Sequence, residues 1–132
     1  MSNDDDHGGK VFREAWITGV TAHYPGTPKD SYIAPWGSTP EWERASAAAV
    51  YRQVADFLGA TEGAAADLSP ELKGQFVAIC WIGQILARIQ DRKPGYIAPW
   101  DQLPDWQQLT DIGIFEAIEH DVKVLRTAAD SR

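Results

Sequence analysis

The residues best suited to binding chemistry are two tryptophans, Trp16 and Trp81, each within a predicted helix. Two indole rings that face one groove could sandwich a planar group such as an adenine, and each stacked base contributes roughly 1–3 kcal/mol. Nearby arginines could bind attached phosphates. The residues predicted to line this ligand site are Trp16, Trp81, Arg13, Arg88, Tyr32 and Tyr96. The rival interpretation is that both indoles only fill an interface within the fold.

No pattern typical of catalysis or of a metal site accompanies these tryptophans. The histidines, His7, His23 and His120, lack the i, i+4 spacing that a helical zinc site favours, so we expect surface or capping roles. Cys80 lies mid-helix, where a buried small hydrophobic residue is the usual interpretation. The sequence therefore predicts no metal and no cofactor. It favours a non-catalytic protein and leaves an enzyme as an open alternative.

The tryptophans belong to an internal sequence repeat. The segment Tyr32–Glu43 returns as Tyr96–Gln107 at an offset of 64 residues, and Trp16 matches Trp81 at an offset of 65. All six tryptophans thereby fall into three pairs. The repeated turn contains Pro35, Trp36, Pro40, Trp42, Pro99, Trp100, Pro104 and Trp106. We interpret the repeat as a duplicated packing unit whose copies pack about an approximate dyad.

Hydrophobic periodicity and proline positions predict about four helices. They span residues 11–22, 40–58, 70–90 and 105–125, with Thr39 capping the second and Ser69 the third. The third helix is apolar on more than one face, so we expect it to be the most buried element. Residues 24–35 should be extended, and a short strand pairing of the two Tyr-Ile-Ala segments is the only β element the pattern allows.

These elements predict an all-α fold in which two pseudo-twofold-related repeats, each a helix, an extended turn and a helix, form one domain. We expect a disordered acidic tail at residues 1–10 and a single domain at 11–126. Within it, repeat one covers 11–59, a mobile linker 60–68 and repeat two 69–126. Residues 127–132 should form a second tail.

Composition and charge limit the possible partners. The 132 residues suffice for about one domain, and 44% of them are hydrophobic, which is ordinary for a compact core. The net charge of −7 disfavours binding to nucleic acid or to an anionic membrane. With a single cysteine, and with no signal peptide or apolar run of membrane-spanning length, we expect a cytoplasmic protein.

The arrangement resembles the tandem RyR repeat, the module named after ryanodine receptors and also found in bacterial and phage proteins. The resemblance lies in the first-helix segments 13–16 and 78–81 and in the turn segments 34–44 and 98–107. It extends from about Phe12 to Val122. The family's usual Gly-Trp-x-Tyr-Gly stretch after the first-helix tryptophan is absent from both units here.

The resemblance implies a non-catalytic sensor module with the first-helix tryptophans lining a groove for an adenine nucleotide, an NAD-derived compound or a similar small molecule. We therefore expect small-molecule binding between the repeats. The alternative is a protein–protein adaptor that uses the exposed Trp-Pro turns as an aromatic contact surface. Partial exposure of Trp16 and Trp81 across a shared cleft would favour the first hypothesis, and an exposed Trp36 or Trp100 the second.

Overall fold

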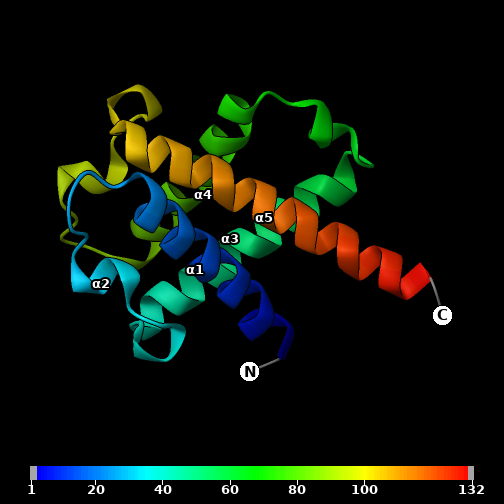
Figure 1. The fold of residues 1–132 in the computed structure, drawn as a ribbon, viewed down its shortest axis with the longest axis horizontal. Helices are drawn as coiled ribbons and strands as arrows, with labels where there is room; N and C mark the ends of the chain where they lie inside the picture. The colour runs from blue at the N-terminus through cyan, green and yellow to red at the C-terminus, as the bar shows by residue number, and fades with distance from the viewer. Residues whose placement is uncertain (1–2, 131–132) are drawn as a thin grey trace.

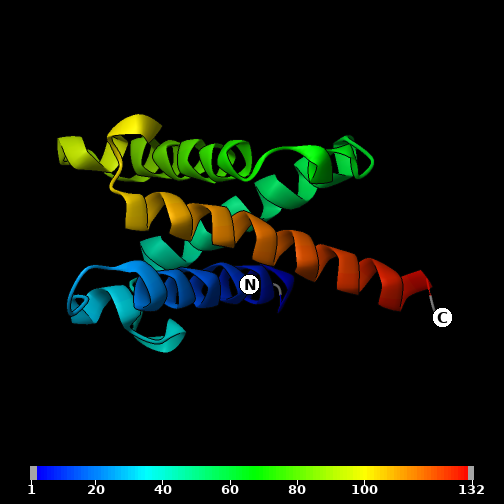
Figure 2. The same ribbon diagram turned by 45° about the horizontal axis from the view of Figure 1, so that its top comes forward.

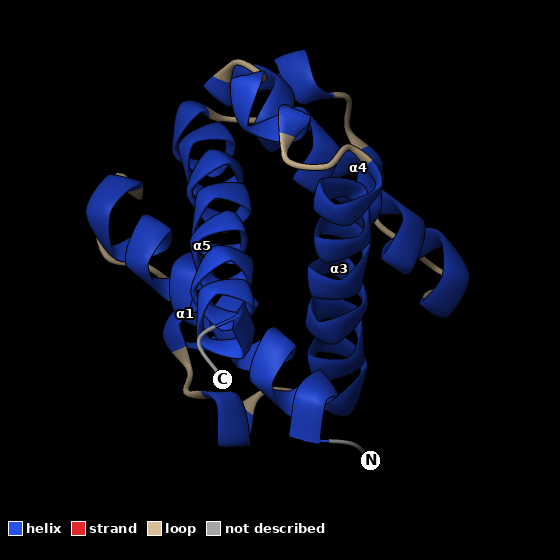
Figure 3. Ribbon diagram, turned by 90° about the vertical axis from the view of Figure 1, so that its right-hand side faces the viewer, coloured by secondary structure: helices blue, strands red, loops and turns tan. Residues whose placement is uncertain are grey.

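The structure is a computed structural model, and it describes residues 3–130 as a set of helices joined by short connections. The α-helices are α1 (Asn3–His23), α2 (Asp30–Ile33), α3 (Glu41–Ala60), α4 (Pro70–Arg88) and α5 (Asp105–Asp130). Short 3₁₀ helices occupy Trp36–Ser38, Ala64–Asp67, Pro94–Ile97 and Trp100–Gln102. No strand occurs among these residues (Figure 3). The predicted all-α fold is confirmed.

The four long helices form three layers. Figure 2 shows α1 and α4 as the outer helices, with α3 and α5 crossing between them. Both middle helices contact both outer helices. The backbones of α1 and α4 are farther apart, and Phe12 of α1 reaches Trp81 of α4 through a ring contact. The C-terminal part of α5 extends beyond the other helices (Figure 1). The core therefore lies where the two middle helices cross.

The core is made of matching positions on α3 and α5. Val50 and Val54 of α3 and Ile114 and Ile118 of α5 are completely buried. Each pair is spaced by four residues, which places its members on one helix face. Val50 matches Ile114, and Val54 matches Ile118, at the offset of 64. The second helix of each repeat thus presents equivalent residues to the core.

Each Trp-Pro turn is held on the first helix of its own repeat by a glycine. A Cβ atom at Gly9 would lie 2.3 Å from Cη2 of Trp36, and one at Gly74 would lie 2.6 Å from Cη2 of Trp100. Real Cβ atoms essentially never come so close to another heavy atom. Glycine is required at both positions because the indole ring lies directly on the helix backbone. These matching contacts support the predicted equivalence of the repeats.

The first helix begins earlier than predicted. We expected residues 1–10 to form a tail, but α1 starts at Asn3, so residues 3–10 are helical. Gly8 and Gly9 are buried beneath the rings of Tyr51 and Trp36, and this packing outweighs their low helix propensity. At the other end α5 continues to Asp130, so residues 127–130 are helical too. Residues 1–2 and 131–132 lie outside the described part of the chain.

The segment predicted as a mobile linker, residues 60–68, is folded. Gly63 adopts a left-handed conformation with φ of 88°, and its N–H donates to the carbonyl of Leu58 at 3.2 Å. Glu62, with φ of 50°, is the left-handed residue that follows the helix cap, and its N–H donates to the carbonyl of Gly59 at 3.1 Å. The two bonds together form a Schellman motif, a common way in which a helix ends. Ala64–Asp67 then form a 3₁₀ helix whose Ala65 is buried against the core. The connection between the repeats is therefore short and ordered by its own hydrogen bonds.

The two Tyr-Ile-Ala segments are helical, so the predicted strand pairing is wrong. Tyr32 and Ile33 belong to α2, and Tyr96 and Ile97 belong to the 3₁₀ helix at Pro94–Ile97. Each tyrosine N–H donates to the carbonyl three residues before it, at 2.9 Å in both repeats. This local hydrogen bond satisfies the amide that a strand would have paired. The residues that flank these short helices, Lys29, Ala34, Lys93 and Ala98, are extended.

One predicted helix cap is confirmed and the other is wrong. Ser69 precedes Pro70, the first residue of α4, and its Oγ accepts a hydrogen bond from the N–H of Leu72 at 3.2 Å. Thr39 does not cap α3. Its hydroxyl group is turned back and donates to the carbonyl of Pro35 at 3.0 Å. Thr39 therefore stabilises the Trp-Pro turn instead of the helix that follows.

The third predicted helix, α4, is not the most buried element. Leu72, Ile79 and Leu86 on α4 are exposed, because this outer helix is covered on one side only. The middle helix α5 supplies the most deeply buried side chains, including Phe115. Although α4 is the most apolar helix, no helix within residues 3–130 has the length and the apolar character needed to cross a membrane.

Replacing the glycine beneath Trp100 should destabilise the fold. We expect Gly74→Ala to lower the free energy of unfolding by about 1–3 kcal/mol, because the new methyl group would collide with Trp100 and Ile112. Urea denaturation followed by circular dichroism measures this loss. Gly113→Ala is the matched control in a neighbouring helix, where nothing lies within 4 Å of an added Cβ. The control should gain about 0.5–1 kcal/mol from helix propensity. Equal effects of the two substitutions would contradict the packing argument.

Candidate functional site

The two first-helix tryptophans do not face each other. Trp16 lies against Trp106, with ring centroids 6.0 Å apart. Trp81 lies against Trp42 at 6.1 Å and stacks on Phe12 at 5.6 Å. Each first-helix tryptophan thus packs on the second-helix tryptophan of the other repeat. Trp16 and Trp81 are therefore not ring neighbours, and the six predicted ligand residues do not form a single site.

Trp16 belongs to an aromatic cluster formed with Tyr24, Tyr32 and Trp106. The centroids of Tyr24 and Trp106 are 4.9 Å apart, and those of Trp16 and Tyr32 are 5.8 Å apart. Nε1 of Trp16 donates to the backbone carbonyl of Tyr32 at 2.8 Å. These rings meet mostly edge to face, an arrangement that stabilises aromatic pairs by about 0.5–1.5 kcal/mol. The cluster fastens the loop before α2 onto α1 and α5.

Arg13 holds α2 and the residue that follows it. The side chain is buried, and its Nε and Nη2 atoms donate to the carbonyl of Ala34 at 3.1 and 2.8 Å. Nη2 also donates to the carbonyl of Ser31 at 2.9 Å. Burial lowers the pKa of Arg13, and Glu43, 3.8 Å away, opposes this shift. Burial also raises the pKa of Glu43. Arg13 therefore acts as a fastener of the turn and has few donors left for a phosphate.

The second repeat has no equivalent clamp. Ala78 occupies the position that matches Arg13. Tyr96, the match of Tyr32, is 45% exposed and has no ring contact among the described residues. Arg88 is exposed, and its Nε donates to Oε1 of Gln84 at 2.9 Å. Of the predicted ligand residues of this repeat, Tyr96 and Arg88 are therefore exposed, whereas Trp81 packs on Trp42 and Phe12.

A groove instead lies beside the second Trp-Pro turn. It has a volume of about 540 Å³ and is lined by Glu71, Trp100, Asp101, Asp105, Gln108, Leu109 and Ile112. We call it the Trp100 groove. Nε2 of Gln108 donates to the carbonyl of Trp100 at 2.7 Å and fixes the turn against α5. The groove therefore combines one half-buried indole with carboxylates and with apolar residues of α5.

The first repeat is less acidic than this groove at two matching positions. Gly37 replaces Asp101, and Arg44 replaces Gln108. Because both turns share the same Trp and Pro residues, we predicted them to be equivalent, although the aligned segments contain this difference. The signal lies in the residue directly after each tryptophan, which is Gly37 after Trp36 and Asp101 after Trp100. Glu71 and Asp105 are matched by the acids Asp6 and Glu41, so the carboxylate that repeat two has in addition is Asp101.

Of the residues considered for catalysis or metal binding, His7 and Cys80 have surroundings that point to a structural role. Within the described part of the chain, no group of three or more His, Cys, Asp and Glu residues is arranged to hold a metal ion. Nε2 of His7 lies 2.9 Å from Asp121, which also accepts a hydrogen bond from the Tyr51 hydroxyl at 2.6 Å. Burial raises the pKa of Cys80 to about 11. This thiol is therefore protonated at neutral pH and a poor nucleophile.

The buried carboxyl group of Asp111 has a strongly shifted pKa. It lies on α5 and is only 7% exposed. Its carboxyl group makes no hydrogen bond or ion pair with the residues the structure describes, and burial raises its pKa to about 8. Ala47 occupies the equivalent position in repeat one. At neutral pH this carboxyl group is therefore mostly protonated.

Neither a protein-family model, nor a curated protein, nor a solved structure matches this chain.

The role of Arg13 predicts a specific loss of stability. We expect Arg13→Lys to lower the free energy of unfolding by about 1–3 kcal/mol, because an ammonium group cannot reach both carbonyls as the planar guanidinium does. Tryptophan emission should also shift to longer wavelength as the aromatic cluster loosens. Arg88→Lys is the exposed control and should change stability by less than about 0.5 kcal/mol. Equal losses in both variants would contradict the clamp.

The buried carboxyl group of Asp111 predicts a pH dependence of stability. Its pKa is about 8 in the folded chain and roughly 3.9 when unfolded. Between these values the folded state holds a proton that the unfolded state has released, so stability falls as pH rises. The slope contributed is at most about 1.4 kcal/mol per pH unit. Asp111→Asn should remove it.

Urea denaturation between pH 5 and pH 8 checks this expectation. The stability of Asp111→Asn relative to the wild type should rise steadily with pH. The exposed-site control Asp105→Asn should run parallel to the wild type over the same range. A constant difference between Asp111→Asn and the wild type would show that this carboxyl group does not titrate in the window.

Proposed function

We propose that this protein is a non-catalytic protein–protein interaction module that binds an arginine-bearing segment of a partner in the Trp100 groove. The observation that carries the proposal is the combination of Trp100 with Glu71, Asp101 and Asp105 around one groove. An aromatic face bordered by carboxylates is complementary to a flat cation. The proposal corresponds to the adaptor alternative, now assigned to one of the two turns.

The chemistry of the groove favours arginine over other cations. A guanidinium group can stack on an indole while its N–H groups donate to a carboxylate. Stacking on an exposed ring contributes about 0.5–1 kcal/mol, and more when water is excluded. An exposed ion pair adds up to about 1 kcal/mol. Leu109 and Ile112 provide apolar surface for the methylene groups of the same side chain.

These contributions predict modest affinity. A few kcal/mol from one arginine is far below the roughly 8 kcal/mol of a micromolar complex, so further contacts along the partner segment are needed. The net charge of −7 would speed encounter with a basic partner at low salt. We therefore expect transient binding that weakens as salt is added.

A nucleotide sensor is less well supported by the same geometry. Trp16 and Trp81 each have other aromatic neighbours, and Arg13 is occupied by backbone carbonyls. The Trp100 groove would repel phosphates because carboxylates surround its indole. Small-molecule binding between the repeats, and with it the relationship to RyR repeats, stays a prediction that rests on the sequence resemblance.

Nuclear magnetic resonance of the tryptophan indole N–H groups tests the proposal directly. The probe is a short peptide of alternating Arg and Ser, compared with a Glu-Ser peptide of the same length. We expect only the Arg-Ser peptide to shift the Trp100 signal, identified by its absence from Trp100→Phe. An Asp101→Asn, Asp105→Asn double variant should bind at least tenfold more weakly, and added salt should weaken binding by the wild type.

The first repeat provides the matched control. Trp36→Ala removes the equivalent ring, which also rests on a glycine, but leaves the acidic groove intact. It should retain peptide binding, whereas Trp100→Ala should lose it. Circular dichroism verifies that both variants fold. Equal binding of the two peptides by the folded wild type, or an unchanged Trp100 signal, would overturn the proposal.

A further inference from the structure

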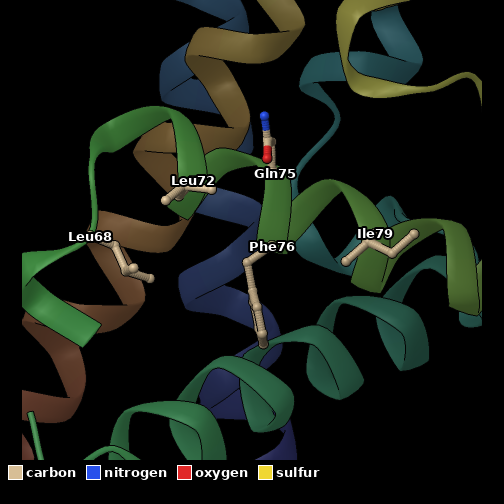
Figure 4. Close-up of a pocket in the computed structure, with 5 residues that line it drawn as sticks. All are labelled: Leu68, Leu72, Gln75, Phe76 and Ile79. Carbon is tan, nitrogen blue, oxygen red and sulfur yellow. The ribbon is translucent and has the colours of Figure 1, made fainter. Parts of the chain in front are cut away.

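The outer face of α4 carries a row of exposed leucine and isoleucine side chains. Leu72, Ile79 and Leu86 are 49%, 61% and 51% exposed. They are spaced by seven residues, so they lie almost in line along the helix over about 21 Å. A groove of about 380 Å³ runs beside the first two and is lined by Leu68, Leu72, Gln75, Phe76 and Ile79. In Figure 4 the Phe76 ring points toward α3, while Gln75 points away from it.

This face lacks charge between its two ends. From Leu72 to Ala87 the only ionisable side chain with a formal charge is Lys73, which is buried and bonded to Glu119 at 3.1 Å. Glu71 stands at the beginning of α4 and Arg88 at its end. In a chain of net charge −7, such an apolar face is the region where two copies could approach with the least repulsion.

The residues of the face are arranged symmetrically about Ile79. Leu72 and Leu86 stand seven positions before and after it. Two antiparallel copies of α4 related by a twofold axis at Ile79 would therefore place Leu72 of one copy against Leu86 of the other. An isologous interface requires this kind of self-complementarity. The acidic start of each helix would also meet the basic end of its partner.

Gly83 adds an independent observation. It lies in the exposed part of α4, and nothing in the chain is within 4 Å of where its Cβ would be. A glycine inside a helix costs about 0.5–1 kcal/mol relative to alanine. The fold of a single chain has no packing need for this glycine. A second helix packed on this face would use it, because the missing side chain permits close approach of the two backbones.

We propose that this face of α4 binds the same face of a second copy of the chain. The two α4 helices run antiparallel, with the twofold axis at Ile79 and with Leu72 of each copy against Leu86 of the other. Heptad spacing of apolar residues is typical of paired helices. The interface meets the Trp100 groove at Glu71, whereas Leu72, Ile79 and Leu86 do not line that groove.

Sedimentation equilibrium of the full chain tests for the dimer. We expect the mass to rise with concentration from 14.6 kDa to twice that value. Ile79→Glu should weaken association at least tenfold, because the two introduced carboxylates would face each other at the axis. Leu125→Glu is the matched control, since Leu125 is 50% exposed on α5 and outside the interface. It should dimerise as the wild type does.

A charge-exchange series tests the register. Leu72→Glu alone and Leu86→Lys alone should each weaken the dimer, because each buries an unpaired charge. Combining them should restore it, since each glutamate then faces a lysine of the other copy. In a parallel dimer the double variant would place like charges together and would stay dissociated. The circular dichroism spectrum of each variant establishes that it is folded.

Two results would overturn the proposal: a wild-type mass of one chain at the highest soluble concentration, or a double variant no better associated than the single ones. An Ile79→Glu chain that remains dimeric would equally exclude this face. Titration of Ile79→Glu with the Arg-Ser peptide separates the two proposals. Retained peptide binding in a monomeric variant shows that failure of one does not entail failure of the other.

Discussion

The contact between an indole ring and a bare stretch of helix backbone is the constraint on which each repeat depends. Trp36 lies on Gly9 and Trp100 lies on Gly74, and neither position has room for a side chain. The proline-rich turn positions the ring, and the ring in turn fixes where the second helix of the repeat begins. Because the first helix must stay regular beneath the ring, α1 extends back to Asn3 through two glycines that would otherwise weaken it.

The two copies share this anchor but differ in how the rest of the turn is held. In repeat one, Arg13 binds loop carbonyls and the cluster around Trp16 covers the loop. In repeat two Ala78 provides no donors, and Tyr96 is exposed. Interactions that fasten the first turn are therefore missing from the second, while the second has gained Asp101 beside its indole. This divergence is the basis for assigning a binding role to the second turn.

The buried ionisable side chains are stabilised in different ways. Arg13 and Lys73 are both buried, and both have polar partners that offset the cost of removing a cation from water. Asp111 has no such partner, and its pKa is raised to about 8. It takes up a proton at neutral pH because a neutral carboxyl group is much cheaper to bury than a carboxylate. The fold therefore tolerates Asp111 at the expense of a stability that decreases with pH.

The sequence by itself determined the helical fold class, the approximate positions of the long helices and the 64- or 65-residue offset that relates the six tryptophans. Helical periodicity and a 64-residue offset are local or linear properties that need no knowledge of neighbours in space. Only the tertiary structure decided that Trp16 packs on Trp106 and Trp81 on Trp42, that Arg13 faces carbonyls, and that one side of α4 is uncovered. Those outcomes depend on how the layers cross, and an apolar residue looks the same in a sequence whether another helix covers it or not.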